Sequence, residues 1–279
     1  MRAVELARQA AHVGAEVLLS HWGRLGKEDA DLKARHDWVS RADRESEQAI
    51  ISFLREQSGG EDGFIGEESG NLAEQQKKAE GSRRTWIIDP LDGTSNYLQH
   101  FPFWSVSIGA REKGIITAGA VYEPLRDQMF TAERGSGAFL NDQRMRVSEQ
   151  KEIEGSFLAT GFPFRAQEHV ETYCAIFQDV IRLCKGVRRA GSAALDLAYT
   201  AAGVFDGFFE LHLAPWDVAA GSLMVEEAGG VVTDFSGGDR YWERGNIVGA
   251  GAAVHSGLLE LISRHTDEAS LERRAERRG

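Results

Sequence analysis

The sequence predicts a mixed α/β protein in which helices and strands alternate along the whole chain, with antiparallel hairpins in the middle. Helical periodicity is clearest over residues 3–21, where apolar side chains recur on one face. Alternating apolar and polar residues with turn glycines predict antiparallel strands over residues 104–121 and 128–139. Because no repeat or long linker divides the chain, we expect one domain. Its expected parts are a lobe over about residues 1–150, a second lobe over about residues 151–265 and a frayed tail over residues 266–279.

Shorter patterns predict the remaining elements. Residues 43–53 indicate a second amphipathic helix, and residues 86–88 indicate a short apolar strand that runs into an Asp-Pro pair. Residues 70–84 are polar and rich in Glu, Gln and Lys, which favours an exposed loop. Further helices are expected over residues 170–184, 192–202, 214–228 and 256–264, and further strands over residues 64–66, 207–211, 230–232 and 247–248.

Charge and composition weigh against nucleic-acid binding. The chain has 279 residues, 42% of them hydrophobic, and a net charge of −11. An acidic protein of this kind repels a nucleic-acid backbone unless it carries a local basic patch. The one basic cluster, the arginines of residues 273–278, is interrupted by glutamates and is typical of a solvated chain end. We therefore expect no nucleic-acid partner.

The chain carries no sequence signal for export or membrane insertion. Its longest apolar run is about ten residues, near residues 245–254, whereas a bilayer span needs roughly 20. The N-terminus lacks the apolar core of a signal peptide, so we expect a cytoplasmic protein without a membrane partner. Cys174 and Cys184 would be separated by about 15 Å in one helix, too far for a disulfide, and are predicted to be buried, reduced thiols.

The most informative stretch is D-P-L-D-G-T-S-N, which begins at Asp89 after a buried strand. A turn stiffened by proline can aim the carboxylates of Asp89 and Asp92 and the carbonyl of Leu91 at one point. Oxygen ligands of this kind suit a hard divalent cation. The backbone N–H groups of Gly93 and Thr94 could bind a phosphate oxygen at a helix start. The alternative is an Asx turn followed by a hydroxyl helix cap.

Other segments also place acids beside apolar elements. Glu67 and Glu68 follow an apolar strand end, Asp217 lies in the first turn of an apolar helix, and Asp37 and Asp43 lie beside a helix start. Each has a simpler interpretation when taken alone. Paired glutamates are usually solvated, an acid in the first turn is favoured by the helix dipole, and acids at a helix start can be caps.

Together these segments resemble the inositol monophosphatase family, whose motifs occur in the same order. The matches are D-x-V-[ST]-x-x-D from Asp37, G-E-E-S from Gly66, W-x-x-D-P-[IL]-D-G-T-x-N-[FY] from Trp86, G-[ST]-A-A from Gly191 and W-D-x-A-A-G from Trp216. The resemblance covers about residues 4–261. It implies a layered α-β-α-β-α sandwich of the sugar-phosphatase type.

The resemblance also implies a site for two or three Mg²⁺ ions. Glu67, Asp89 and the carbonyl of Leu91 would hold the first ion. Asp89, Asp92 and Asp217 would hold the second, and a third, weaker ion would lie near Glu67.

The resemblance implies catalytic roles for Glu67, Thr94 and Asp43. Thr94, paired with Asp43 and close to Glu67, would help to orient the attacking water. Gly93 and Thr94 would contact the phosphate.

The alcohol part of the substrate would meet a different set of residues. The resemblance implies that Ser192, Ala193 and Glu210 face the alcohol, and that Asp92 and Asp217 also border the substrate. Glu210 precedes Asp217 by seven residues, as the family pattern requires.

The chemistry of such a site is understandable without the family. A phosphate monoester and a hydroxide are both anions, so carboxylates alone would repel them. Two divalent ions reverse the charge of the site, lower the pKa of a bound water and stabilise the attacking and leaving oxygens. No Cys, Ser or His nucleophile is then required, and His100 and His212 are interpreted as structural or rim residues.

We expect hydrolysis of a small phosphate monoester, with myo-inositol monophosphate as the leading substrate. Fructose-1,6-bisphosphatase, histidinol-phosphate phosphatase and 3′-phosphoadenosine phosphatase share the metal motifs and remain alternatives. Some bacterial relatives bind the transcription machinery, so a regulatory binding role is a further alternative. The resemblance also implies inhibition by Li⁺ and a homodimer, although residues 187–189 and the apolar face of residues 170–184 could be either core or interface.

Overall fold

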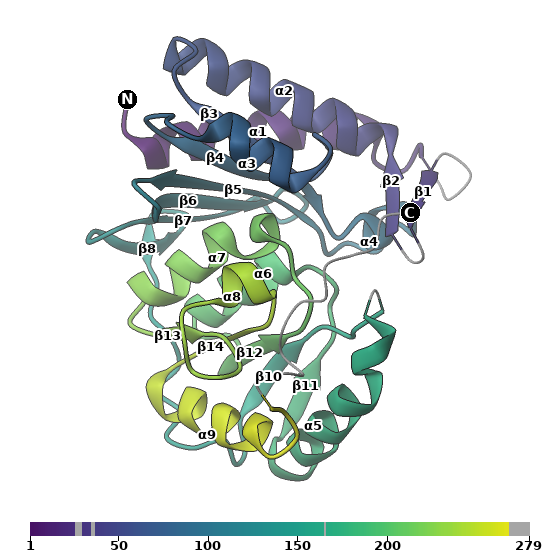
Figure 1. Ribbon diagram of the computed structural model, residues 1–279, viewed down its shortest axis with the longest axis vertical. Coiled ribbons are helices and arrows are strands. Elements are labelled where there is room, and N and C mark those ends of the chain that lie inside the picture. The colour runs from purple at the N-terminus through teal and green to yellow at the C-terminus, as the bar shows by residue number, and fades with distance from the viewer. Residues whose placement is uncertain (26–29, 35–36, 165, 268–279) are drawn as a thin grey trace.

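A computed structural model describes residues 1–25, 30–34, 37–164 and 166–267 and shows helices and sheets in alternating layers (Figure 1). Two helices cover the outer face of a seven-stranded sheet, two more lie between this sheet and a five-stranded sheet, and a last pair covers the second sheet. In that order they are α1 (Ala3–His21) and α2 (Arg41–Ser58), α6 (Ala193–Ala201) and α7 (Pro215–Glu227), and α5 (Val170–Leu183) and α9 (Ala252–Ser263). The predicted layered α/β sandwich is confirmed.

The seven-stranded sheet has the order β3-β4-β5-β6-β7-β8-β9. Only β3 and β4 run parallel, and every later neighbour pairs antiparallel. The strands are β3 (Gly63–Gly66), β4 (Thr85–Asp92), β5 (Ser105–Glu112), β6 (Ile115–Glu123), β7 (Gln128–Glu133), β8 (Gly137–Leu140) and β9 (Gln143–Arg144). The antiparallel hairpins predicted from the alternating pattern are therefore present.

The five-stranded sheet has the order β11-β10-β12-β14-β13. Strand β10 runs parallel to both of its neighbours, whereas β14 runs antiparallel to β12 and β13. The strands are β10 (Phe157–Thr160), β11 (Gly186–Arg188), β12 (Gly207–Glu210), β13 (Val231–Thr233) and β14 (Ile247–Ala250). Thr160 and Glu210 end parallel neighbours and therefore lie at the same edge of the sheet.

Helix α7 is buried on nearly all sides because it lies between the two sheets. Its residues from Val218 to Val225 are all buried and nearly all apolar, so the helix lacks the one-sided pattern of a surface helix. The close approach depends on glycines in the sheet. A Cβ at Gly109 would lie 2.7 Å from the Cβ of Ala219, and one at Gly119 would lie 2.9 Å from the Cα of Ala220. This packing holds the first turn of α7, with Asp217, against the large sheet.

Several short elements were not anticipated or differ from expectation. The polar segment expected to be a loop contains α3 (Leu72–Ala79), because the Asn71 side chain accepts hydrogen bonds from the N–H groups of Ala73 and Glu74 and so caps a helix. Strands β10 and β11 were not predicted. The other short elements are β1 (Ala30–Ala34), β2 (Asp37–Ser40), α4 (Thr94–Leu98), η2 (Gln167–His169) and α8 (Tyr241–Arg244).

Both cysteines are free thiols, as expected, but neither is buried as predicted. Cys174 is exposed, and Cys184 is half-buried. The error for Cys174 arises because this residue lies on the solvent-facing side of α5, whereas the buried side carries Tyr173, Ile176 and Val180. Within the described ranges, no helix is long and apolar enough to cross a membrane.

Candidate active site

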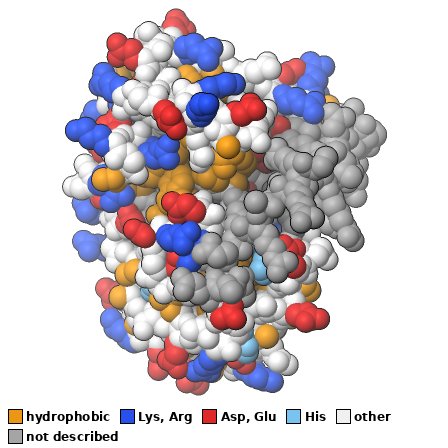
Figure 2. Space-filling model, in the orientation of Figure 1, with side chains coloured by type: hydrophobic (Ala, Val, Ile, Leu, Met, Phe, Trp, Pro, Cys, Tyr) orange, Lys and Arg blue, Asp and Glu red, His pale blue; other side chains and the backbone are white. Residues whose placement is uncertain are grey.

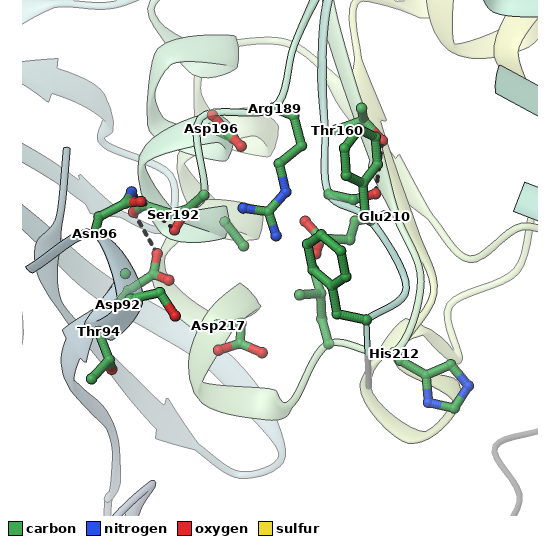
Figure 3. Close-up of a pocket in the computed structure, with 18 of the residues that line it drawn as sticks. Asp92, Thr94, Asn96, Thr160, Arg189, Ser192, Asp196, Glu210, His212 and Asp217 are labelled. Carbon is green, nitrogen blue, oxygen red and sulfur yellow. Dashed lines mark hydrogen bonds between the residues drawn. The ribbon is translucent and has the colours of Figure 1, made fainter. Parts of the chain in front are cut away.

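A pocket of about 360 Å³ lies between the two sheets and is lined by residues from both. The large-sheet side supplies Glu67, Asp89, Leu91, Asp92, Gly93 and Thr94. The small-sheet side and the central helices supply Thr160, Arg189, Ser192, Ala193, Asp196, Glu210, His212 and Asp217 (Figure 3). Apart from Asp43, which lies behind Thr94, every residue predicted for the site therefore borders this one pocket.

Strand β4 brings Asp89 and Asp92 to the pocket through an irregularity in its pairing. Residues three apart in a regular strand point to opposite faces. The register between β4 and β5 shifts between Asp89 and Asp92, at the proline of the motif. The backbone N–H of Leu91 donates to Asp89 Oδ1 at 3.0 Å, which fixes the turn. Both carboxylates can therefore reach the same cluster.

Asp217 approaches the same point from α7. Its Oδ2 accepts a hydrogen bond from the backbone N–H of Ala214 at 2.6 Å, so Asp217 also caps its own helix. Carboxylate oxygens of Asp89, Asp92 and Asp217 all lie within 4.8 Å of one another. This group, called the acid cluster below, contains three of the four predicted metal-binding side chains.

Burial and mutual repulsion raise the pKa values of the acid cluster. The pKa of Asp89 lies well above its ordinary value because the side chain is buried and because Glu67, Asp92 and Asp217 are close. Burial and Asp217 raise the pKa of Asp92 to about 7, although hydrogen bonds from Ser192 and Ala194 oppose the shift. Buried carboxylates that repel one another are relieved by a divalent cation. The donor set therefore fits a hard metal ion.

Glu67 and Leu91 lie at the edge of the acid cluster. Glu67 is half-buried, lines the pocket and raises the pKa of Asp89 through its charge. It is outside the set of oxygens that lie within 4.8 Å of one another. The carbonyl of Leu91 lies 3.2 Å from Thr94 Oγ1. Both groups are placed where they could complete the coordination of a second ion.

Thr94 and Asp43 form the predicted pair. Thr94 Oγ1 donates to Asp43 Oδ1 at 3.1 Å. The other carboxylate oxygen of Asp43, which is 1% exposed, accepts hydrogen bonds from the backbone N–H and the hydroxyl of Ser40 in a capping box. Asp43 is therefore a helix cap and also the partner of Thr94, so the two interpretations do not exclude each other. The side chain of Asp37 lies outside the described residues.

The backbone conformation at position 93 requires glycine. Its φ of 101° lies in the left-handed region, and a Cβ there would lie 3.1 Å from the carbonyl oxygen of Phe103 and 3.3 Å from that of Gly191. Asn96 joins the same two segments, because its side-chain amide donates to the carbonyls of Phe103 at 2.7 Å and Ala190 at 2.9 Å. The turn after β4 is thereby tied to the segment that precedes α6.

Ser192 and Ala193 lie at the start of α6, beside the acid cluster. The Ser192 hydroxyl donates to Asp92 Oδ2 at 2.6 Å, and the backbone N–H of Ala194 donates to the same oxygen at 2.7 Å (Figure 3). Ser192 thus supports Asp92 and also borders the pocket, whereas Ala193 presents a small apolar surface there.

Glu210 lies across the pocket from Asp92, at the end of β12 (Figure 3). A Cβ at Gly161 would overlap the Glu210 carboxylate, so the absence of a side chain at Gly161 provides the space for Glu210. The carboxylate therefore occupies a prepared position in the pocket wall.

Two charged residues that line the pocket, Arg189 and Asp196, were missed as site residues. Arg189 projects between Asp92 and Glu210, and its guanidinium lies over the rings of Phe162 and Phe164 (Figure 3). Asp196 is 1% exposed, and burial raises its pKa well above the ordinary value, with further contributions from Glu210 and Asp92. The sequence analysis recognised the G-S-A-A segment between Arg189 and Asp196. That motif does not indicate which way the side chains on either side of it point. His212 was interpreted as a structural or rim residue, and it lies at the rim.

Comparisons with known proteins agree on one family. A model of the inositol monophosphatase family matches residues 2–270. The chain is 42% identical to Nus factor SuhB of Escherichia coli (strain K12) over 256 residues, which cover 92% of this chain and 94% of that protein. It is also 42% identical to Nus factor SuhB of Vibrio cholerae, over 96% of this chain and 98% of that protein.

Solved structures give the same result. Extragenic suppressor protein suhB from Bartonella henselae superposes with a TM-score of 0.87 at 40% identity and covers 94% of this chain and 98% of its own. Inositol monophosphatase from Anabaena superposes with a TM-score of 0.81 at 33% identity and covers 95% of this chain and 97% of its own.

Proposed function

Because the chain belongs to the inositol monophosphatase family, we propose that it hydrolyses a small phosphate monoester with Mg²⁺ bound at the acid cluster, and that myo-inositol monophosphate is its substrate. The observation that carries the proposal is one pocket with two different acidic sides. Asp89, Asp92 and Asp217 converge on one side, and Glu210 faces them from the other. The first side suits a metal-bound phosphate, and the second suits the hydroxyls of an alcohol.

The residues of the acid cluster would hold the metal. Asp89, Asp92 and Asp217 would bind through carboxylate oxygens, with Glu67 and the carbonyl of Leu91 as further ligands. Mg²⁺ bound there would neutralise the phosphate, lower the pKa of a water and stabilise the leaving oxygen.

The chain itself positions the water and the phosphate. The Thr94 hydroxyl, held by Asp43, can accept a hydrogen bond from a water on the pocket side while it donates to Asp43. The left-handed turn at Gly93 would leave the backbone N–H groups of Gly93 and Thr94 available to a phosphate oxygen. Ser192 keeps Asp92 in one orientation through its 2.6 Å hydrogen bond.

Phosphate release should require a divalent cation. We expect robust release of phosphate from myo-inositol 1-phosphate with Mg²⁺ and none in excess EDTA, because the cluster would otherwise repel both anionic reactants. A colorimetric phosphate assay over inositol monophosphates, fructose 1,6-bisphosphate, histidinol phosphate and adenosine 3′,5′-bisphosphate measures this and ranks the substrates. Full activity in EDTA would exclude the metal mechanism. Faster release from another ester of the panel would identify that ester, rather than inositol monophosphate, as the preferred substrate.

Glu210→Gln should show whether Glu210 binds the alcohol part of the substrate rather than its phosphate. A charged acceptor paired with hydroxyls contributes about 1.5–3 kcal/mol, so kcat/KM for inositol 1-phosphate should fall by about one to two powers of ten. The loss with p-nitrophenyl phosphate, which lacks those hydroxyls, should be far smaller.

The matched variant is Glu67→Gln, which removes a charge from the metal side of the same pocket and should reduce turnover of both substrates alike. Equal losses for both substrates in Glu210→Gln would place Glu210 with the metal ligands or the scaffold. No loss for either would remove it from the substrate site.

A second function, a regulatory role at the transcription machinery, is favoured by one observation. The curated relatives at about 40% identity carry the name Nus factor SuhB. The charged side chains on the face shown in Figure 2 are of both signs and interspersed, which gives no extended basic surface for nucleic acid there. The net charge of −11 also disfavours a nucleic-acid partner, so we expect such a role to use protein contacts. If no substrate of the panel released phosphate with Mg²⁺, the regulatory role would be better supported than the phosphatase activity.

A further inference from the structure

A second group of metal-ligating side chains lies outside the acid cluster. Glu168 and His169 belong to η2, and His212 follows β12. One ligand atom from each of these three residues lies within 4.8 Å of the other two. The two imidazole rings have centroids 4.8 Å apart and an interplanar angle of 38°. The three residues are called the histidine cluster below.

The histidine cluster lies beside the pocket, because His212 is one of the residues that line it. Thr160 to Phe164 also line the pocket, and η2 with His169 comes shortly after them in the sequence. His212 lines the pocket, but its ring is turned away from Asp217 (Figure 3). Two segments far apart in the sequence therefore present their ligands at one place, separate from the carboxylates that suit Mg²⁺.

The backbone conformation at His212 is unusual for a residue with a side chain. Its φ of 64° lies in the left-handed region, which L side chains rarely adopt and which glycine adopts freely. In this conformation the His212 ring lies beside that of His169. Glu168 is exposed and His212 is half-buried, so a solvated ion can reach the group.

We propose that Glu168, His169 and His212 bind a Zn²⁺-type transition-metal ion at the rim of the pocket. Two imidazoles and one carboxylate are a recurrent ligand set for Zn²⁺, which leaves a fourth position for water or for a group of the substrate. Imidazole nitrogens select Zn²⁺, Co²⁺ or Ni²⁺ over Mg²⁺, which prefers oxygen ligands and keeps several waters. The two sites therefore take different classes of ion.

The position of the site gives the ion a structural effect on the pocket. His212 lies two residues after Glu210 and five before Asp217. An ion shared with His169 would fix the loop between these two acids to the segment that leads into α5. The entrance of the pocket would then be held in one arrangement.

The test is Zn²⁺ titration of the full-length protein with Mg²⁺ in excess, in competition with a chromogenic chelator at neutral pH. The wild type should bind one Zn²⁺ that Mg²⁺ does not displace. His212→Gly removes a ligand and suits the left-handed backbone, so the fold should be retained. Its affinity for Zn²⁺ should fall by at least the ~10–100-fold that loss of an outer-shell partner costs. His169→Ala should behave in the same way.

A matched control is His100→Gly. His100 also has a positive φ, 56°, and its Nε2 lies 3.0 Å from the carbonyl oxygen of Leu25, away from the pocket. This variant should bind Zn²⁺ like the wild type. Co²⁺ gives a second measurement, since a four-coordinate site with nitrogen ligands absorbs visible light far more strongly than an octahedral oxygen site.

Two results would overturn the proposal. The first is equal affinity for Zn²⁺ in the wild type and in His212→Gly. The second is loss of the Mg²⁺-resistant Zn²⁺ in Asp89→Asn but not in His169→Ala, which would place the ion at the acid cluster. Neither result depends on phosphate release, so the proposed phosphatase activity is tested separately.

Discussion

Asp89→Asn should abolish phosphate release and raise the melting temperature of the metal-free protein. Asp89 is the most central member of the acid cluster: it is 1% exposed, and its pKa responds to Glu67, Asp92 and Asp217. We expect the loss in kcat to exceed the roughly 10²- to 10⁴-fold that removal of an acid–base group costs, because Asp89 is proposed to be a ligand of both ions. Phosphate release at saturating Mg²⁺ measures it.

The stability gain follows from the sign of the pKa shifts. The pKa values of Asp89 and Asp92 are raised in the folded, metal-free protein, so the folded state holds more protons than the unfolded state above the ordinary pKa of about 3.9. Their contribution to stability is complete below that value and is lost as the pH rises, for Asp92 through about 7. In EDTA the melting temperature of the wild type should therefore rise as the pH is lowered from 8 toward 5.

Asparagine at position 89 removes one of the repelling charges, so the pH dependence in EDTA should be weaker. Mg²⁺ should stabilise the wild type more than the variant. Asp239→Asn is the matched control, because Asp239 is exposed and is not among the residues that line the pocket, and it should change neither measurement. Near-wild-type kcat in Asp89→Asn, or a lower melting temperature in EDTA, would contradict the assignment.

Thr94→Val should lower kcat by about 10²- to 10⁴-fold while the fold is retained. Valine keeps the shape of threonine but removes the hydroxyl that lies 3.1 Å from Asp43 and 3.2 Å from the carbonyl of Leu91. If Thr94 has the proposed role, the attacking water would lose its positioning partner, and Asp43 would lose one hydrogen bond. Steady-state kinetics on the preferred substrate measures the effect.

Two further variants make this result specific. Thr94→Ser keeps the hydroxyl and should recover most of kcat. Thr117→Val removes a hydroxyl that donates to the carbonyl of Ala110 in a distant hairpin, and kcat should be unchanged. If Thr94→Val retains full activity, Thr94 serves only the local structure at the start of α4.

Local patterns predicted the parts of the site that depend on contiguous sequence. The run from Asp89 to Thr94 carries its own turn, and Asp217 lies in the first turn of a helix whose apolar composition is evident. Arg189 was not recognised, because its position depends on how the two sheets face each other. It follows the short strand β11, and three residues give no period that indicates the direction of a side chain.

The errors in the fold have similar causes. Strand β10 is four residues long and pairs in parallel with two strands that come later in the chain, so its evidence lies in long-range contacts rather than in residues 157–160. Helix α3 is different, because Asn71 followed by Glu74 is a cap signal that was available in the sequence. The overall polarity of the segment outweighed that signal in the prediction.

The packing of α7 divides the molecule into a stiff part and an adjustable part. Ala219 and Ala220 lie against Gly109 and Gly119 with no room for an added methyl group, so the helix cannot slide along the large sheet without a clash. The position of Asp217 relative to the large sheet is consequently set by backbone packing. Glu210, on the other side of the pocket, lies at the end of a short strand and faces the space left by Gly161. If the proposed roles hold, variation near Gly161 and Glu210 would change which ester is accepted while the metal side of the pocket kept its geometry.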